Sequence, residues 1–336
     1  MSRRWRVAVS GDMASADGST IYGDIGLGDL TDAGLAWEVV DPVDGRLRGG
    51  DLEGFDALLL LGGLPVDEDT LDEVTTLRHI ARFGAGYEKV DLEACDRRGI
   101  TVTNAPTGLR TPMAHTALTL LLALAHNLLA KDRLVREGRW EDKAALHGHG
   151  LARATIGVVG LGGIGRETVR MLRGLGLTVV GWNRSPRPEF CAEAGIEQVE
   201  LDELLRRSDF VVLTVAAAAG TRHLIGAREL ELLGPGGFLV NIARGSVVDE
   251  EALIQALRAE RLAGAGLDVF ETEPLPADSP LTGMANVVLA PHSLCWTRDF
   301  IDATAAEVRE CLVAMARGER PATVVNDPDA GDRTID

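Results

Sequence analysis

The sequence predicts an α/β protein with two domains, each built on a parallel sheet. The length of 336 residues fits about two domains at roughly 150 residues each. Short apolar runs of strand type alternate with segments of helical spacing along most of the chain, and such alternation is typical of βαβ units and parallel sheets. A polar stretch at 138–150 separates two such series, which indicates two domains.

The expected elements follow in order. The first series has its strands at 5–9, 35–40, 57–61, 79–83 and 101–103. The second series has its strands at 155–159, 177–181, 210–214, 238–242, 263–267 and 286–289. Between the two series, the apolar run at 116–130 predicts one long helix that begins near Pro112 and is buried or faces another subunit.

Composition excludes several classes of function. The chain carries 34 Lys+Arg against 51 Asp+Glu, a net charge of −17, so we expect no nucleic-acid partner. The run at 116–130 is too short to cross a bilayer, so we expect no membrane partner. Four widely spaced cysteines and a start without an apolar signal-peptide core favour a cytoplasmic protein with reduced thiols. A metal site is not expected either, because His147 and His149 form a pair without a third ligand.

A glycine-rich turn carries the strongest local signal. In TIGVVGLGGIGRETVRML, Gly160, Gly162 and Gly165 have G-x-G-x-x-G spacing after an expected strand, and the turn opens a helix. The first glycine permits the turn, the second admits a pyrophosphate, and the third allows close helix packing. Gly163 and Ile164 complete the expected cofactor site; the alternative is a glycine-rich connection without a ligand. The helix should bury the face formed by Ile164, Thr168, Leu172 and Leu175.

The end of the next strand bears on the choice of dinucleotide. An acidic residue for the ribose 2′-hydroxyl is expected roughly 20 residues after the glycine turn, but Asn183 stands there, followed by Arg184 and Ser185. A guanidinium can bind a 2′-phosphate through paired hydrogen bonds. These residues favour NADP, while NAD remains the alternative if Asn183 bonds the hydroxyl and Arg184 is merely solvated.

Three polar residues follow three later strands. Arg244 comes after FLVNIA, Glu273 lies a few residues beyond AGLDVF, and His292 follows NVVLAP. Ligands of open parallel sheets bind outside the carboxyl ends of the strands, so these side chains can converge. Arginine can grip a carboxylate, and histidine beside glutamate can transfer a proton. Each residue alone has an ordinary alternative, as a surface ion pair, a loop residue or a packed histidine.

Several motifs in order resemble the D-isomer-specific 2-hydroxyacid dehydrogenase family. The similar pieces are ARFGAGYEKVDLEACDRRGITVTNAP, VVGLGGIGRE, VNIARGSVVDEEAL, GAGLDVFETEPLP, NVVLAPH and PATVVN. The resemblance implies that Arg244 binds the substrate carboxylate and carbonyl, that His292 is the acid/base, and that Glu273 is its partner. It also implies that Ala243 and Asp268 lie at the cofactor.

The resemblance implies further features of the fold and the assembly. The backbone amides of Ala85 and Gly86 would bind the substrate carboxylate. A doubly wound Rossmann-type cofactor domain, 107–292, would be inserted into a flavodoxin-like substrate domain, 1–106 plus 293–336. The helix from about Pro112 would form a homodimer interface. Its apolar run predicts the same interface, and Asp at Leu121 is expected to weaken the dimer if the helix faces a partner. Unlike the small residues usual in the family, Leu294, Cys295 and Trp296 follow the histidine segment and add bulk.

The expected function is therefore that of an oxidoreductase. It would transfer hydride between NADP(H), or NAD(H), and a small 2-keto or D-2-hydroxy acid, as glyoxylate/hydroxypyruvate reductases do. The alternative is a non-catalytic dinucleotide sensor, a scaffold or corepressor of the same fold. The presence of Arg244, Glu273 and His292 together favours catalysis.

Overall fold

The computed structural model describes residues 4–328. The chain forms two compact units: unit 1 comprises 1–109 and 296–336, and unit 2 comprises 110–295. Residues 1–3 and 329–336 of the expected substrate domain lie outside the described residues. Each unit has its own parallel sheet and its own apolar core.

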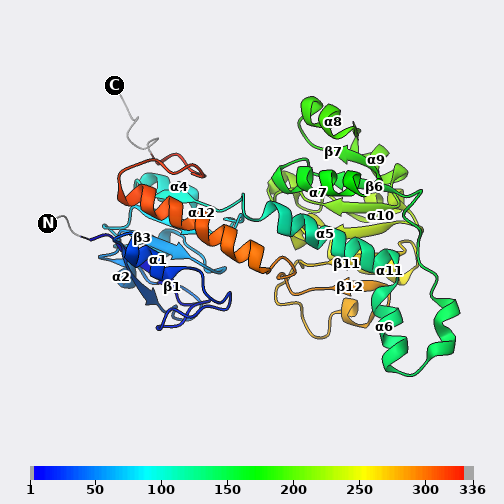
Figure 1. Ribbon diagram of the computed structural model, residues 1–336, viewed down its shortest axis with the longest axis horizontal. Coiled ribbons are helices and arrows are strands. Elements are labelled where there is room, and N and C mark those ends of the chain that lie inside the picture. Colours follow the sequence, from blue (N-terminus) through cyan, green and yellow to red (C-terminus); the bar gives the residue numbers. More distant parts are fainter. Residues whose placement is uncertain (1–3, 329–336) are drawn as a thin grey trace. The chain divides into compact units, whose positions relative to one another are not determined.

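Unit 1 contains a five-stranded parallel sheet in the order β2-β1-β3-β4-β5, which is the flavodoxin-like order. Its core is built from the strands and from apolar residues of the helices around them. The strands are β1 (Arg6–Ser10), β2 (Ala36–Val40), β3 (Ala57–Leu60), β4 (His79–Arg82) and β5 (Thr101–Thr103), and the helices are α1 (Leu27–Asp32), α2 (Gly49–Leu52), α3 (Glu68–Leu71), α4 (Leu92–Arg97) and α12 (Arg298–Ala316) (Figure 1).

Unit 2 contains a seven-stranded parallel sheet in the order β12-β11-β10-β9-β6-β7-β8. Two groups of helices pack in this unit: α5 with α7, and α9 with α10 and α11. The strands are β6 (Thr155–Val159), β7 (Thr178–Trp182), β8 (Glu197–Gln198), β9 (Phe210–Leu213), β10 (Phe238–Asn241), β11 (Gly264–Leu267) and β12 (Val287–Leu289). The α-helices are α5 (Arg110–Ala125), α6 (Leu128–Arg136), α7 (Gly163–Gly174), α8 (Pro188–Ala194), α9 (Leu201–Arg207), α10 (Ala227–Leu233) and α11 (Glu250–Arg258), and the 3-10 helices are η1 (Trp140–Ala145), η2 (Ala219–Thr221), η3 (Gly245–Val247) and η4 (Pro280–Gly283).

The strand order of unit 2 confirms the predicted fold class. Counted from β6, the order is that of a Rossmann-type doubly wound sheet with an additional edge strand. Every strand expected from the sequence is present, and its ends differ from the prediction by at most one residue. The short β8 was not predicted, because two residues are too few to show a period. The order in which the chain adds strands to the sheet reverses between β6 and β9, and ligands bind at this position in such folds.

The prediction of one helix through 116–130 is wrong. Helix α5 ends at Ala125, and α6 begins at Leu128 after a bend of 61°. Asn127 has a φ of 51°, in the left-handed region that interrupts a helix. The run is apolar mainly because α5 packs within unit 2, against α7, β10, β11 and β12. Leu121 is fully buried there, so it does not face a partner as expected.

Two further features of the described residues bear on the expectations. Among the described residues, no single helix is long and apolar enough to cross a membrane. The bent pair α5 and α6 together has the length and the apolar composition of a membrane span, but most residues of α5 are buried inside the protein. All four cysteines are buried and unpaired. Burial raises the pKa of the Cys295 thiol to about 12, which makes it a packing residue rather than a nucleophile.

Candidate active site

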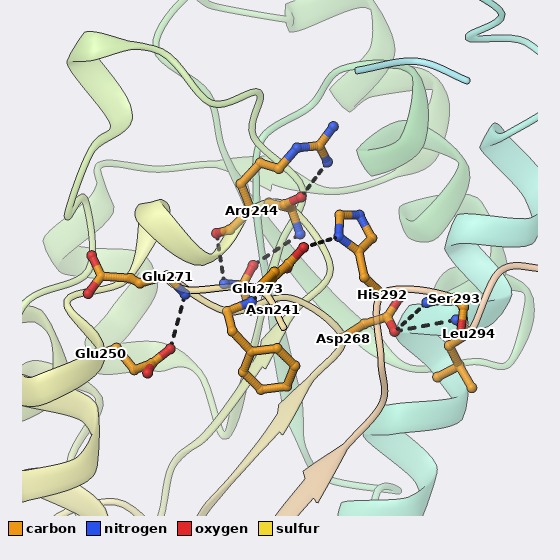
Figure 2. Close-up of polar contacts among 11 residues, drawn as sticks. Asn241, Arg244, Glu250, Asp268, Glu271, Glu273, His292, Ser293 and Leu294 are labelled. Atoms are coloured by element: carbon orange, nitrogen blue, oxygen red, sulfur yellow. Dashed lines mark hydrogen bonds and ion pairs between the residues drawn. The ribbon is translucent and has the colours of Figure 1, made fainter. Parts of the chain in front are cut away.

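The three predicted polar residues lie near one another in unit 2. Arg244, Glu273 and His292 follow β10, β11 and β12, which are neighbours in the sheet. Because the strands are parallel, their carboxyl ends meet at one edge. Figure 2 shows the carboxylate of Glu273 pointing toward the ring of His292, with the side chain of Arg244 above them in this view.

Asn241 fixes the turn that presents Arg244. Its side-chain Nδ2 donates to the Arg244 carbonyl at 3.0 Å, and its Oδ1 accepts from the Ala243 N–H at 3.0 Å. Asn241 is 1 % exposed, so both of its polar groups need these partners. The guanidinium of Arg244 donates back to the Ala243 carbonyl at 2.7 Å, and it extends beyond the turn (Figure 2).

Gly245 allows the Arg244 turn to lie directly on the loop that carries Glu273. A Cβ at Gly245 would lie 1.8 Å from the Phe270 carbonyl carbon and 2.3 Å from the Glu271 nitrogen. No side chain fits at those distances. The glycine of the Ala-Arg-Gly segment therefore sets the spacing between the arginine and the glutamate loop.

Glu273 and His292 form a hydrogen-bonded pair. The Nδ1 atom of His292 lies 2.8 Å from Oε2 of Glu273, and Oε1 of the same carboxylate accepts from the Phe270 N–H at 3.0 Å. Half-burial by itself raises the pKa of Glu273, but its bonds to His292 and Phe270 and the charge of Arg244 outweigh burial, so the pKa lies below the usual value. The carboxylate is thus ionised at neutral pH.

Asp268 supports the segment after the histidine. Its Oδ1 accepts from the N–H groups of Ser293, at 3.2 Å, and Leu294, at 3.3 Å. Burial raises the pKa of this carboxyl, while those hydrogen bonds and nearby His292 oppose the rise. His292 itself has a φ of 53°, an uncommon conformation for a residue other than glycine. The two hydrogen bonds help to hold that backbone.

A second histidine–glutamate pair lies beside the first and was missed by sequence reasoning. His223 Nε2 hydrogen-bonds Glu271 Oε1, and the His223 N–H donates to the Ser246 carbonyl at 2.8 Å. The Glu271 N–H donates to Glu250 Oε2 at 3.1 Å. These contacts tie the loop of Glu273 to the segment after Arg244. The signal in the sequence was the first glutamate of FETEP, Glu271, two residues before Glu273.

The glycine turn has the shape of a dinucleotide site. Gly160 has a φ of 107°, and a Cβ there would lie 2.8 Å from the Val215 nitrogen, while a Cβ on Gly165 would lie 1.8 Å from the Gly160 carbonyl oxygen. Gly162 has nothing within 4 Å of the same position, which leaves its surface open to a ligand. No side chain caps the first turn of α7, and no acidic residue stands in that turn.

The buried face of α7 was predicted nearly correctly. Thr168 and Leu172 are buried, and Ile164 is partly buried. Leu175, however, is 58 % exposed. It is the C-cap residue of α7, where the chain leaves the helix and the periodic spacing no longer applies.

The residues expected at the 2′ end of the dinucleotide lie beside the glycine turn. Asn183 Oδ1 accepts from the Leu161 N–H at 2.9 Å, and its Nδ2 donates to the Ser185 carbonyl at 2.8 Å. Arg184 is exposed, and within residues 4–328 it makes no hydrogen bond or ion pair through its side chain. Its Nη1 lies 3.6 Å from where a Cβ of Gly220 would be. The asparagine thus shapes the loop, and the arginine stays available.

Ala85 and Gly86 belong to unit 1, in the loop after β4. Gly84 has a φ of 131°, and Asn104 Nδ2 donates to the Ala85 carbonyl at 2.8 Å. These features hold the loop. In the part of the chain that the structure describes, neither the Ala85 nor the Gly86 N–H donates a hydrogen bond.

Trp296 also lies in unit 1, where its ring meets the Tyr22 ring edge-on with centroids 4.9 Å apart. It is 38 % exposed. Trp296 comes four positions after His292 along the chain. The added bulk expected from the sequence is therefore an indole held against a tyrosine.

Comparison with known proteins shows a family relationship. Residues 118–293 match the family model described as D-isomer specific 2-hydroxyacid dehydrogenase, NAD binding domain. The chain is 43 % identical over 277 residues to a glyoxylate reductase of Thermococcus gammatolerans, covering 81 % of this chain and 83 % of the relative. It is 41 % identical over 276 residues to a glyoxylate reductase of Korarchaeum cryptofilum, covering 81 % and 82 %.

A solved structure resembles the whole fold. It is an NADPH-dependent glyoxylate/hydroxypyruvate reductase from Sinorhizobium meliloti, in complex with NADP and malonate. The TM-score is 0.82 at 31 % identity, and the match covers 96 % of this chain and 97 % of the other. With the doubly wound sheet and its glycine turn, these similarities show that the chain belongs to the D-isomer specific 2-hydroxyacid dehydrogenases and is an NAD(P)-dependent 2-hydroxyacid oxidoreductase.

Proposed function

We propose that this protein is an NADPH-preferring reductase of small 2-keto acids, with glyoxylate and hydroxypyruvate as its best substrates. The observation that carries the proposal is the Glu273–His292 pair beside Arg244 at the carboxyl edge of the sheet. Reduction of a 2-keto acid requires one group to hold the carboxylate and another to protonate the carbonyl oxygen. The relatives named above supply the substrate class.

The glycine turn fits a dinucleotide on the chemistry of its own backbone. Gly160 and Gly165 allow contacts that a Cβ would prevent, and Gly162 is open. The uncapped first turn of α7 presents unpaired N–H groups and a partial positive charge to a diphosphate. We assign Gly160, Gly162, Gly163, Ile164 and Gly165 to this contact.

The other cofactor residues are assigned to the two ends of the molecule. Asn183, Arg184 and Ser185 would surround the adenosine ribose, and the free guanidinium of Arg184 favours a 2′-phosphate. Ala243 and Asp268 would lie at the nicotinamide end. When bound there, the reduced nicotinamide supplies a hydride to the substrate carbonyl carbon.

Two sets of donors would orient the substrate carboxylate. Arg244 offers a planar pair of N–H donors to its oxygens. Ala85 and Gly86 offer two adjacent backbone N–H groups without partners among residues 4–328.

His292 is the proposed general acid of reduction. With Nδ1 bonded to Glu273, the ring directs Nε2 away from the glutamate, and Nε2 donates the proton to the developing alkoxide. The ionised Glu273 holds the imidazole in orientation through this hydrogen bond. In the reverse reaction the same nitrogen takes the hydroxyl proton.

The proposal is tested by oxidation of NADPH and NADH with glyoxylate, hydroxypyruvate, pyruvate and phenylpyruvate. We expect the highest kcat/KM for glyoxylate and hydroxypyruvate, and a D-hydroxy acid wherever the product is chiral. His292→Ala purified in parallel is the blank for contaminating reductases. Failure to oxidise either cofactor with any of the four acids would refute the proposal, and a preference for phenylpyruvate would refute the substrate assignment.

The assembly we propose is a cytoplasmic homodimer. Helix α6 and the 3-10 helix after it project from the body of unit 2 (Figure 1). They expose Leu128, Leu129, Val135 and Trp140, each at least 47 % exposed, and several large apolar side chains exposed on one segment are typical of subunit interfaces. Four buried thiols without a disulfide suit a reducing compartment.

A further inference from the structure

Arg110 lies against the glycine turn but belongs neither to the G-x-G-x-x-G motif nor to the other family motifs. It is the first residue of α5, and α5 packs along α7. A Cβ built on Gly163 would lie 3.0 Å from Nε of Arg110, 3.5 Å from its Cδ and 3.6 Å from its Cγ. The arginine side chain therefore runs across the face of Gly163, at the start of α7.

The charge of Arg110 has no partner in the described part of the chain. Its side chain is exposed and makes no hydrogen bond or ion pair within residues 4–328. Some exposed arginines of this acidic protein are paired: Arg139 contacts Glu137 and Asp142, and Arg207 contacts Glu197 and Glu203. An arginine placed against a glycine backbone, without a hydrogen-bond or ion-pair partner among the described residues, has its N–H donors available to an anion.

The surroundings of Gly163 favour an anion as well. The first turn of α7 contains no acidic residue, and no side chain caps it. The N–H groups of that turn and the guanidinium of Arg110 thus bring two independent sources of positive potential to one place. Arg166 also stands in this turn, but its Nε is directed to the Gly162 carbonyl at 3.4 Å.

We propose that Arg110 binds the diphosphate of the dinucleotide. The inference rests on the proposed dinucleotide site, and it adds a cationic ligand to the backbone N–H groups. The contact does not involve the adenosine 2′ position, so Arg110 strengthens the binding of NADPH and NADH equally. In this it differs from Arg184, which distinguishes the two.

The inference is tested by binding measurements without turnover, using Arg110→Ala and Arg110→Lys. Dissociation constants for NADH, NADPH, ADP-ribose and adenosine are measured by calorimetry. We expect Arg110→Ala to raise the Kd of the three diphosphate ligands about tenfold and to leave adenosine within about twofold. Lysine should restore part of the loss, because it keeps the charge without the planar fork. Added salt should weaken ADP-ribose binding more in the wild type than in Arg110→Ala.

Arg153→Ala is the matched control, because Arg153 is exposed and unpaired in unit 2 but precedes β6, at the opposite edge of the sheet. It should bind every ligand as the wild type does. Unchanged binding of ADP-ribose by Arg110→Ala, or equal loss for adenosine and ADP-ribose, would overturn the inference. If the wild type binds no dinucleotide, the proposed function fails instead, so the two failures are distinguishable.

Discussion

The carboxylate of Glu273 bonds the His292 ring with one oxygen and the Phe270 backbone with the other, at 2.8 Å and 3.0 Å. The second bond matters as much as the first, because it prevents the carboxylate from rotating away. The His292 imidazole is therefore held by a carboxylate that is itself fixed by the Phe270 backbone. This two-step anchoring gives His292 a fixed direction for its free nitrogen.

The first prediction concerns this pair. His292→Ala should lower kcat for 2-keto acid reduction about 10²–10⁴-fold, because proton transfer is lost. Glu273→Gln keeps the size of the side chain but replaces the carboxylate that bonds Nδ1 of His292. That variant should lower kcat by less than His292→Ala does, because the imidazole remains but loses its charged partner. A normal kcat for either variant would contradict the assigned roles.

The second prediction concerns Arg244. Arg244→Ala should lower kcat/KM about 10²-fold or more, mainly through KM, because the substrate carboxylate loses a charge-assisted bidentate contact. Arg244→Lys should recover little, since an ammonium cannot form the paired contact. Arg261→Ala is the control: it removes an exposed guanidinium just before β11, at the opposite edge of the same sheet. Equal effects of the two alanine variants would count against a role for Arg244 in binding.

The third prediction concerns His79 in the core of unit 1. The side chain is fully buried, its Nε2 bonds Thr103 Oγ1 at 2.8 Å, and its Nδ1 has no partner among the described residues. Burial lowers the pKa of His79 to about 3, against about 6.5 in an unfolded chain. Between these values the unfolded chain binds the extra proton, so the free energy of unfolding falls as pH falls.

The measurement is urea unfolding at pH 8 and pH 5. The buried imidazole should contribute about 2 kcal/mol to the loss of stability between them, at about 1.4 kcal/mol per pH unit below 6.5. His79→Gln should lose that part of the pH dependence, whatever its stability at pH 8. His126→Gln, at an exposed position, should retain the wild-type dependence. The assignment fails if His79→Gln and the wild type lose stability in parallel.

The fourth prediction concerns the exposed apolar surface of α6. Leu129 is 47 % exposed and Val135 is 60 % exposed. If they face a second subunit, Leu129→Asp and Val135→Asp should shift sedimentation from a dimer to the 35.8 kDa monomer. Leu175→Asp makes the same change at a residue 58 % exposed at the end of α7, and it should leave the dimer intact. A wild-type monomer at micromolar concentration would refute the dimer.

The sequence predicts this fold well because periodicity and spacing report local structure. The strand at 155–159, the glycine turn and the helix after it follow from short-range rules. The break at Asn127 was not predictable from hydrophobicity, because the run continues apolar on both sides while the backbone turns. For the same reason Leu121 was taken for an interface residue although it packs inside unit 2.

Only the site residues that belong to sequence motifs could be predicted. Arg244, Glu273 and His292 follow strand ends, and the rule for parallel sheets brings them to one edge. The partners that fix them, Asn241 and Phe270, bond through contacts that no spacing rule gives. Arg110 lies 53 positions before Gly163, and only the packing of α5 on α7 brings the two together.

The last prediction is a preference for NADPH over NADH. Asn183 replaces the acidic residue that would repel a 2′-phosphate, and both groups of its side chain already bond the loop backbone. Arg184 has no partner of its own among residues 4–328. The ratio of kcat/KM for NADPH to that for NADH should therefore exceed one in the wild type, and Arg184→Ala should lower it about tenfold.

Asn183→Asp should lower the same ratio further, because a carboxylate repels the 2′-phosphate and can accept a hydrogen bond from the ribose hydroxyl of NADH. The substitution keeps the size of the side chain, and its oxygen can still accept from the Leu161 N–H, so the glycine turn should persist. Arg110→Ala supplies the comparison, since it should weaken both cofactors without changing their ratio. A wild-type preference for NADH would refute the prediction, and so would a ratio that neither Arg184→Ala nor Asn183→Asp reduces.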